Sequence, residues 1–261
     1  MEIASVNNPR VKDWAQLLEK KHRTRQGKYI IEGIHLVQEA LLHQAEIECI
    51  AYDMDKGIPG ELSRYEGTAG VEWIGVSAAV IAKCTDTVTP QAVFAVIRKD
   101  TKQADELLRK PDSLVIVLDR LQDPGNVGTI IRSADAAGAD GVILGRGSAD
   151  VYNPKTIRST MGSFFHLPVV EADLRVILPE AKEAGVTLVS TSLAAEHSCY
   201  SYDFKGSRWI VIGNEGSGVS EEVNELVDDA VIIPSKGQAE SLNAAMAATV
   251  LLFEAMRQRH Y

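Results

Sequence analysis

Three polar segments of the sequence, each placed directly after an apolar run, combine glycine with amide, carboxylate or hydroxyl side chains. They are DRLQDPGNVG at residues 119–128, GNEGSG at 213–218 and IPSKGQAESLN at 233–243. Glycine-rich turns allow the backbone to approach a ligand closely. Loops at the carboxyl edge of one sheet can also converge on a single ligand. The ordered set of three therefore indicates one binding or catalytic site.

Asn126 and Arg132 give the first segment and the helix after it their chemistry. Asn126 carries an amide that both donates and accepts hydrogen bonds. Arg132 falls near the start of an expected helix, where the helix dipole disfavours a cation. A guanidinium kept at such a position is suited to holding a phosphate group. An ordinary DPGN turn followed by a solvated helix residue is the alternative for this segment taken alone.

The other two segments also have ordinary structural explanations when each is considered alone. GNEGSG is typical of a flexible turn between a strand and a helix. Ser241 and Asn243 are residue types that cap helices. The information therefore lies in the ordered set of three segments and not in any one of them.

Apolar runs that alternate with helical patterns surround the three segments and must hold them in place. Short apolar runs bounded by turns are typical of buried strands, and parallel strands need crossovers between them. The alternation predicts an α/β domain with a parallel sheet. Its expected strands are residues 114–118, 141–144, 169–170, 186–191, 209–213 and 230–233, and its expected helices are one closed by Gly138, one from Asn153, 174–184, 221–227 and one from Ser241. In the last helix the spacing assigns these residues to the core: Leu242, Ala245, Met246, Thr249, Phe253 and Met256.

Residues 1–98 show a similar alternation, which predicts a small α/β domain. Its expected strands are residues 29–31, 47–52, 71–76 and 92–97, and its expected helices are one from Asn8-Pro9, 34–43 and 78–83. Five basic residues lie within nine positions: Lys20, Lys21, Arg23, Arg25 and Lys28. This cluster can be the solvated end of a helix or a phosphate-contacting surface, with Trp14 and His22 as stacking groups. Residues 99–112 are polar and are expected to form a partly helical linker.

Composition limits the class of protein. With 45% hydrophobic and 24% charged residues, the 261-residue chain has the composition of an ordinary soluble globular protein. Its net charge of −9 argues mildly against a nucleic-acid partner unless basic residues are clustered. The three cysteines are scattered and lack metal-binding spacing, which indicates reduced thiols and a cytoplasmic location. No apolar stretch is long enough to span a bilayer, so no membrane association is expected.

The motifs together resemble one family. The set N-x-G-x-x-x-R, G-N-E-G-x-G, I-P after a strand and S-L-N before a long terminal helix resembles the SpoU (TrmH-like) branch of the SPOUT methyltransferases. The similarity covers Leu114 to the terminus and includes NPKTIRSTMGSFFHLPV. Around GKYIIEGIHLVQEAL, the first domain resembles the ribosomal-protein-like RNA-binding domain of many members.

This resemblance implies an activity and an architecture. The activity is transfer of a methyl group from S-adenosylmethionine to a ribose 2′-hydroxyl of structured RNA, with ribosomal RNA favoured over transfer RNA. The architecture is a small α/β RNA-binding domain at residues 1–98, a linker at 99–112 and a parallel-sheet α/β methyltransferase domain at 113–261. The resemblance further implies a deep trefoil knot in the last domain and a homodimer with its active sites at the interface.

The resemblance also assigns roles to residues. Arg132 matches the arginine that binds RNA phosphate and helps to deprotonate the ribose hydroxyl. Because a guanidinium is normally fully protonated, we assign it chiefly the roles of phosphate clamp and hydroxyl orienter. The other polar positions of the catalytic set are Asn126, Glu215, Ser241 and Asn243. The predicted cofactor-binding residues are Thr191, Gly213, Gly216, Ile233 and Leu242.

The predicted RNA face and two alternatives complete the expectations. The face consists of the N-terminal basic cluster together with Lys155 and Arg158, and no metal site is predicted. A Rossmann-type methyltransferase is one alternative, but the loop after residues 114–118 lacks the G-x-G core of that fold. A non-catalytic RNA-binding protein that retains the fold is the other, and such a protein would be expected to lose the polar motif positions, which are all present here.

Overall fold

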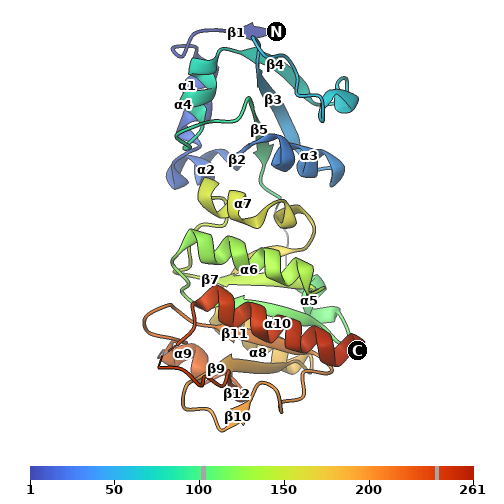
Figure 1. The fold of residues 1–261 in the computed structure, drawn as a ribbon, viewed down its shortest axis with the longest axis vertical. Helices are drawn as coiled ribbons and strands as arrows, with labels where there is room; N and C mark the ends of the chain where they lie inside the picture. Colours follow the sequence, from blue (N-terminus) through green and yellow to red (C-terminus); the bar gives the residue numbers. More distant parts are fainter. Residues whose placement is uncertain (101–103, 239–240) are drawn as a thin grey trace. The chain divides into compact units, whose positions relative to one another are not determined.

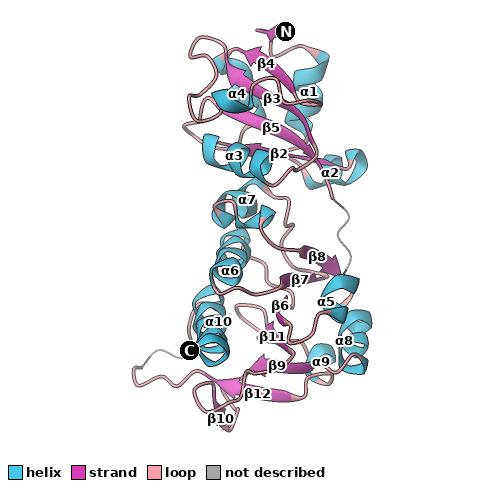
Figure 2. Cartoon of the chain, turned by 90° about the vertical axis from the view of Figure 1, so that its right-hand side faces the viewer, coloured by secondary structure: helices cyan, strands magenta, loops and turns pink. Residues whose placement is uncertain are grey.

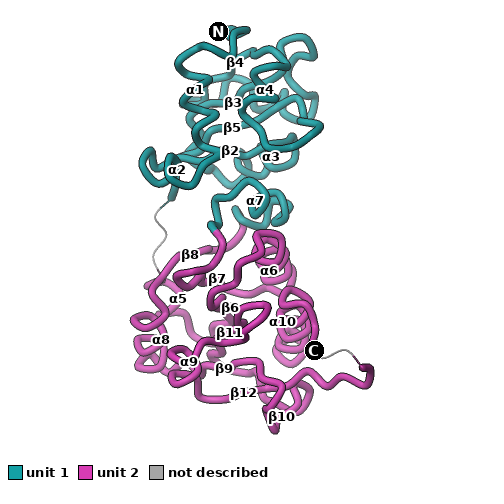
Figure 3. Tube along the Cα trace, turned by 90° about the vertical axis from the view of Figure 1, so that its left-hand side faces the viewer, with its two compact units in different colours: residues 1–101, 150–165 teal, residues 102–149, 166–261 magenta. Residues whose placement is uncertain are grey.

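The computed structural model describes residues 1–100, 104–238 and 241–261 (Figure 1). The chain forms two compact units, shown in different colours in Figure 3. Unit 1 comprises residues 1–101 and 150–165, and unit 2 comprises residues 102–149 and 166–261. None of the helices in these described ranges is long and apolar enough to cross a membrane.

Unit 1 is built on a mixed sheet with the strand order β1-β4-β3-β5-β2. Its strands are β1 (Glu2–Ile3), β2 (Lys28–Glu32), β3 (Ile47–Asp53), β4 (Glu72–Val76) and β5 (Val93–Arg98). β5 runs antiparallel to both β2 and β3, whereas β3 and β4 are parallel. The four expected strands of this region are confirmed to within one or two residues at each end. The short β1 was not predicted, because two residues carry no periodicity.

Helices cover both faces of this sheet. They are α1 (Pro9–Gln16), α2 (Lys20–Gln26), α3 (Ile34–Leu42), α4 (Ala78–Cys84) and α7 (Pro154–Thr160), with single 3₁₀ turns η1 (Ser63–Tyr65) and η2 (Ser163–Phe165). Side chains of α1 and α4 pack with Phe94 and Val96 on one face. Side chains of α3 and α7 pack with Ala95 and Ile97 on the other. Alternate residues of β5 therefore belong to separate cores, as the period of a strand requires.

Residues 150–165 lie in unit 1, although sequence analysis expects them in the C-terminal domain. Ile157 of α7 is fully buried in the core beneath α3. Tyr152 and Phe164 pack their rings against Tyr29, with centroid distances of 4.9 and 6.0 Å. Asp150 forms an ion pair with buried Arg23 at 2.7 Å. The segment is therefore held by apolar, aromatic and ionic contacts within unit 1.

Unit 2 contains a seven-stranded sheet with the order β10-β12-β9-β11-β6-β7-β8. Its strands are β6 (Leu114–Leu118), β7 (Gly141–Gly145), β8 (Val169–Ala172), β9 (Thr187–Thr191), β10 (His197–Ser198), β11 (Arg208–Ile212) and β12 (Asp229–Ile232). Every neighbouring pair is parallel, which confirms the predicted parallel-sheet α/β fold. The six expected strands are present, and β10 was not predicted.

The helices of unit 2 lie on opposite faces of its sheet, as Figure 2 shows. They are α5 (Asp105–Arg109), α6 (Pro124–Ala136), α8 (Leu174–Glu183), α9 (Glu221–Asn224) and α10 (Ala244–His260). α6 and α10 pack side by side on one face, and α5, α8 and α9 occupy the other. Leu107 of α5 is buried in the unit 2 core, so the described end of the expected linker is packed and helical, while residues 101–103 lie outside the described part.

The predicted core face of α10 is wrong in three positions. Leu242, Met246 and Phe253 are 48%, 51% and 41% exposed. The buried side of the helix is instead formed by these residues: Ala245, Ala248, Leu251, Leu252, Glu254 and Ala255. Apolar residues occur on nearly every side of this helix, so periodicity could not decide which side faces the sheet. The exposed side keeps its own apolar row.

Candidate functional site

The three polar segments meet at the carboxyl edge of the unit 2 sheet. β6 and β11 are neighbours, and from them the chain leaves in opposite directions, β6 leading to β7 and β11 leading past β9 to β12. Such a reversal is where parallel α/β sheets place their ligands. The loops after β6, β11 and β12 are the three segments that sequence analysis singles out. The topology therefore supports the convergence that was expected from sequence.

Glu215 joins the loop after β11 to the loop after β6. Its carboxylate accepts hydrogen bonds from the backbone N–H groups of Gln122 and Asp123, at 3.2 and 3.1 Å, and from the Asn126 amide at 3.0 Å. Partial burial acts to raise the pKa of Glu215, but these donors outweigh it and the pKa lies below its ordinary value. Glu215 is therefore an ionised acceptor that fixes the loop, and it is poorly placed to take a proton.

Asn126 and Asn243 extend this connection to the third segment. The Asn126 carbonyl oxygen accepts a hydrogen bond from the Asn243 amide at 3.1 Å. Asn243 also caps α10, accepting from the N–H groups of Ala245 and Met246 at 2.9 and 3.3 Å. A continuous chain of hydrogen bonds thus links Glu215, Asn126 and Asn243. Both asparagine amides are used as donor and as acceptor, so their orientation is determined by the network.

Gly213 is required by the closure of its own loop. Asn214 and Gly218 exchange two backbone hydrogen bonds of 2.8 and 2.9 Å. A Cβ atom on Gly213 would lie 2.1 Å from the carbonyl carbon of Gly218 and 2.2 Å from the nitrogen of Val219. No side chain fits there without reopening the loop. The structure therefore explains this glycine by backbone packing, before any ligand is considered.

We expect Gly213→Ala to destabilise the protein by about 1–3 kcal/mol, because the added methyl group overpacks against backbone. Gly216→Ala is the matched control, since its Cβ would approach nothing nearer than 3.6 Å. Chemical unfolding of the full chain measures both changes. Equal stability of the two variants would show that the loop can relax around a side chain.

Two residues of this edge were missed by sequence analysis. The Asn214 side chain accepts from the N–H groups of Gly216 and Ser217 and donates to the carbonyl of Arg120 at 2.9 Å. Asp119 is 3% exposed and accepts from the N–H of Ser220 at 2.7 Å. A polar residue one or two positions after a buried strand is the signal that could have found each of them.

The other predicted cofactor residues lie at or near the ends of adjacent strands. Thr191 ends β9 and pairs with Val231 of β12, and Ile233 directly follows β12. Both side chains are half-buried, whereas Leu242 and Gly216 are exposed. Together with Gly213 after β11, they surround the carboxyl edge of three neighbouring strands.

Arg132 lies on α6 and is exposed. It makes no ion pair or hydrogen bond with any residue that the structure describes. Ser241 is also exposed. Helical geometry turns Arg132 by roughly 120° around α6 from Asn126. The network of Asn126, Glu215 and Asn243 therefore does not include these two predicted catalytic residues.

The basic cluster is only partly available to a ligand. Lys20, Lys21 and Arg25 are exposed. Arg23 is 2% exposed and donates to the carbonyls of Leu17 and Leu18 as well as to Asp150, so its interpretation as an RNA contact is wrong.

Lys28 and the two expected stacking groups are also buried or bonded within unit 1. Lys28 is half-buried in an ion pair with Glu48. Trp14 is 3% exposed in the core, so its expected stacking role is wrong as well. His22 is largely buried, and its ring contacts the Arg25 guanidinium at 3.0 Å.

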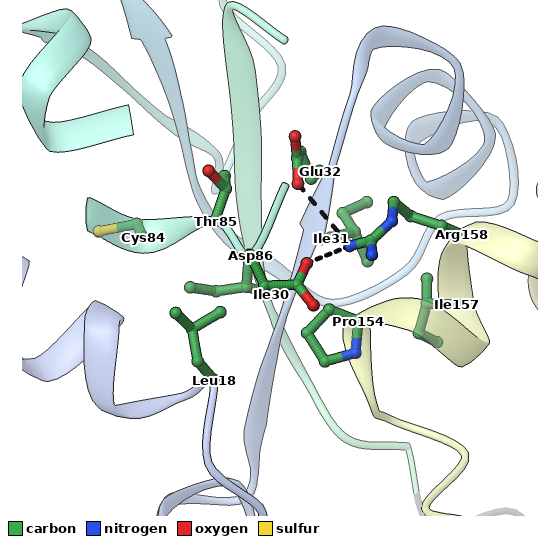
Figure 4. Close-up of a pocket in the computed structure, with 10 residues that line it drawn as sticks. All are labelled: Leu18, Ile30, Ile31, Glu32, Cys84, Thr85, Asp86, Pro154, Ile157 and Arg158. Carbon is green, nitrogen blue, oxygen red and sulfur yellow. Dashed lines mark hydrogen bonds and ion pairs between the residues drawn. The ribbon is translucent and has the colours of Figure 1, made fainter. Parts of the chain in front are cut away.

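Arg158 borders a small pocket within unit 1, shown in Figure 4. Its guanidinium forms an ion pair with Asp86 and lies 3.8 Å from a Glu32 oxygen that has no hydrogen bond among the described residues. Apolar side chains form the other walls, among them Ile30, Ile157 and Pro154. The charge of Arg158 is therefore compensated by carboxylates. Lys155, the other predicted RNA contact of this helix, is exposed to solvent.

Comparison with known proteins gives matches along nearly the whole chain. Residues 113–253 match the model of the SpoU rRNA Methylase family. Residues 8–95 match the model of the MRM3-like substrate binding domain. Both matches follow the order of the segments in this chain, and they decide against the Rossmann-type alternative.

Individual relatives are similar in length as well as in sequence. The chain is 39% identical to the 23S rRNA (guanosine(2553)-2′-O)-methyltransferase RlmP of Bacillus subtilis, covering 97% of this chain and 98% of the relative. It is 35% identical to the 23S rRNA (uridine(2479)-2′-O)-methyltransferase of Streptomyces viridochromogenes, covering 97% and 91%. The solved structure of the SpoU methyltransferase AviRb from that organism with AdoMet superposes with a TM-score of 0.90 at 34% identity, covering 97% and 98%.

Proposed function

The chain belongs to the SpoU rRNA methylase family, and we propose that it methylates a ribose 2′-hydroxyl of 23S ribosomal RNA. It is an S-adenosylmethionine-dependent rRNA 2′-O-methyltransferase. The observation that carries the assignment of the site is the hydrogen-bond chain Glu215–Asn126–Asn243, which unites three loops at the topological switch point. All five polar positions are present and three of them are mutually hydrogen-bonded, which supports a catalytic role over a non-catalytic one.

The residues at the sheet edge fit the cofactor. Thr191, Gly213 and Ile233 offer backbone groups at the ends of three adjacent strands. Leu242 offers an exposed apolar side chain, and Gly216 offers exposed backbone. Such a mixture of apolar contact and backbone polar groups is typical of small-molecule sites. S-Adenosylmethionine supplies, when bound, a methyl group on sulfur that is open to in-line displacement.

The protein's contribution to the reaction is mainly positioning. Arg132 binds an RNA phosphate and orients the ribose hydroxyl, since a fully protonated guanidinium donates hydrogen bonds and accepts none. Glu215 holds the loop that carries Asn126. Asn243 fixes the start of α10 beside Asn126, and Ser241 precedes it as a further polar group. Glu215 and Asn243 therefore act as positioning residues.

A homodimer with a knotted C-terminal domain is part of the proposal. The exposed apolar side chains of Met246 and Phe253 on α10, with Leu242 just before the helix, support an interface on this helix. Arg132 points away from Asn126, roughly 120° around α6. This separation supports a site that is completed by Arg132 of a second copy. The packing of α10 against α6 and the likeness to SpoU structures over the whole chain support the knot.

The proposal also covers domains and location. Unit 1, with residues 1–101 and 150–165, is the RNA-binding domain, and unit 2, with residues 102–149 and 166–261, is the methyltransferase domain. The match of residues 8–95 to a substrate-binding domain supports the first of these. The action of the relatives on ribosomal RNA and three free, buried cysteines support a cytoplasmic location.

The test of this function combines calorimetric titration with S-adenosylmethionine and transfer of labelled methyl groups to unmodified 23S rRNA. Binding in the first experiment and label on ribose oxygen in the second are expected. Cofactor binding without methylation of 23S rRNA, but with methylation of transfer RNA, would redirect the substrate assignment. Absence of both would overturn the function.

Replacing Lys20, Lys21 and Arg25 by glutamine should weaken binding to 23S rRNA and reduce the slope of log K against log salt by about 2. The three side chains are exposed on or beside one short helix, so their charges act together. The matched control replaces the exposed Lys56, Arg64 and Lys83 elsewhere in unit 1. Filter binding of 23S rRNA from 50 to 200 mM KCl measures the affinity and the salt slope of the variant and of the control. An equal change in the control would assign the effect to overall charge.

A further inference from the structure

Three arginines follow three neighbouring strands at the carboxyl edge of the unit 2 sheet. Arg120 comes after β6, Arg146 directly follows β7, and Arg175 lies at the start of α8, just after β8. These strands are adjacent in the order β6-β7-β8. The side chains of Arg120, Arg146 and Arg175 are 50%, 77% and 62% exposed. The three residues, called here the arginine edge, are thus available to solvent along one rim.

Two carboxylates connect the arginine edge. Asp173 lies 3.2 Å from the Arg146 guanidinium and accepts from Arg175 at 2.9 Å through the same oxygen. Glu222 accepts from Arg120 at 2.9 Å and also acts electrostatically on Arg175. Asp119 also lies 4.0 Å from the Arg120 guanidinium, so the three guanidiniums are paired with three carboxylates. In a chain whose net charge is −9, three arginines along one edge are a local feature.

The two carboxylates differ in how firmly they are held. The hydrogen bond from the Arg175 side chain lowers the pKa of Asp173 to about 2, so this group stays ionised. Its side chain is 18% exposed, whereas that of Glu222 is 63% exposed. Asp173 is therefore a fixed anchor for two arginines, and Glu222 is the partner that a competing anion can displace.

The backbone of Arg120 indicates that its side chain is needed. Its φ is +55°, in the left-handed region that glycine adopts freely and other residues adopt at a cost. The Asn214 amide holds its carbonyl at 2.9 Å, and its side chain lies beside Gly147, where a Cβ would be 3.4 Å from Arg120 Cγ. An arginine is retained where a glycine would be relaxed.

Arg120 lies in the same segment after β6 as the residues that bind Glu215. Arg120 stands two residues before Gln122 and three before Asp123, whose N–H groups bind Glu215. Asn214, which holds the Arg120 carbonyl, is the neighbour of Glu215 in the chain. The position of Arg120 is therefore coupled to the loop that carries Asn126.

We propose that the arginine edge binds phosphates of the RNA backbone beside the target nucleotide, with a phosphate displacing Glu222 from Arg120. This inference rests on the proposed function, since it assumes an RNA substrate. Guanidinium groups form paired hydrogen bonds with phosphate oxygens, and Asp173 pre-orients two of the three. The edge thus provides the catalytic unit with its own RNA contact, separate from the basic cluster of unit 1.

The test replaces Arg120, Arg146 and Arg175 together by glutamine in the full chain. Filter binding of a 23S rRNA transcript from 50 to 200 mM KCl should give a slope lower by about 2, and KM for RNA should rise at least tenfold. Affinity for S-adenosylmethionine should stay unchanged. The matched control replaces Arg109, Lys182 and Lys205, which are followed by strands and so lie at the amino edge of the same sheet.

Two single variants sharpen the test. Arg120→Gly should keep or raise the thermal stability, because glycine relaxes the left-handed backbone, while reducing the salt slope by less than one. Glu222→Gln should tighten RNA binding. If the wild type methylates 23S rRNA and the triple variant keeps the same salt slope of RNA binding and the same KM for RNA, the proposal for the arginine edge is overturned but the proposed function stands. A wild type that neither binds nor methylates RNA would overturn the proposed function with it.

Discussion

Replacing Arg132 by alanine is expected to lower kcat for methyl transfer by roughly a hundredfold to ten-thousandfold, the usual range for a group that assists proton removal or orientation. Cofactor affinity and stability should change little, because the side chain is exposed and has no ion pair or hydrogen bond among the described residues. Single-turnover methylation of 23S rRNA, beside titration with S-adenosylmethionine, separates the two effects.

The matched control for this variant is Arg109→Ala, which removes an exposed helical arginine at the opposite edge of the same unit. Arg132→Lys tests the geometry of the group, since lysine keeps the charge but loses the planar fork that pairs with phosphate. We expect lysine to restore a minor part of the rate. Normal turnover in Arg132→Ala would remove this residue from the mechanism and leave the ribose hydroxyl to be oriented by other groups.

Loss of the carboxylate of Asp150 should destabilise unit 1 by about 3–5 kcal/mol, the typical cost of leaving a buried charge without its partner. The Arg23 side chain is 2% exposed and that of Asp150 8%. In Asp150→Ala the guanidinium would keep only the carbonyls of Leu17 and Leu18. Urea unfolding followed by Trp14 and Trp73 fluorescence, in a Trp209→Phe background, reports on unit 1 alone.

Two further variants test the cause. Asp105→Ala breaks an exposed ion pair with Arg109, whose side chains are 59% and 82% exposed, and should cost less than about 0.5 kcal/mol. Arg23→Met combined with Asp150→Leu removes both charges and should recover most of the lost stability. If the double variant were as unstable as Asp150→Ala, packing and not charge would explain the loss.

Sequence patterns predicted most strands and the meeting of the three loops, because both depend on local order. A buried strand followed by a polar turn is readable along the chain, and parallel strands bring their carboxyl ends to one edge. The patterns could not show that Glu215 binds the N–H groups of Gln122 and Asp123. Contacts of that kind depend on how distant loops close, which no spacing within one segment records.

The failures have equally specific causes. Arg23 belongs to a basic run by sequence, but its partner Asp150 is 127 positions away, so its burial could not be foreseen. The apolar face of α10 was assigned to the wrong side because apolar residues occur on both sides of this helix, with Leu251 and Leu252 buried but Met246 and Phe253 exposed. Trp14 was read as a stacking group because a large aromatic near basic residues is consistent with either role.

Residues 150–165 follow part of unit 2 in the chain but fold with unit 1. This arrangement has a consequence for protein engineering and for evolution. A fragment ending near residue 100 would lack α7, and the pocket that Ile157 fills beneath α3 would be open to water. A fragment beginning at residue 113 would carry α7 without the strands it covers. The two units therefore cannot be exchanged between relatives as contiguous segments of sequence. Recombination that preserves folding must transfer the inserted helix together with the N-terminal module.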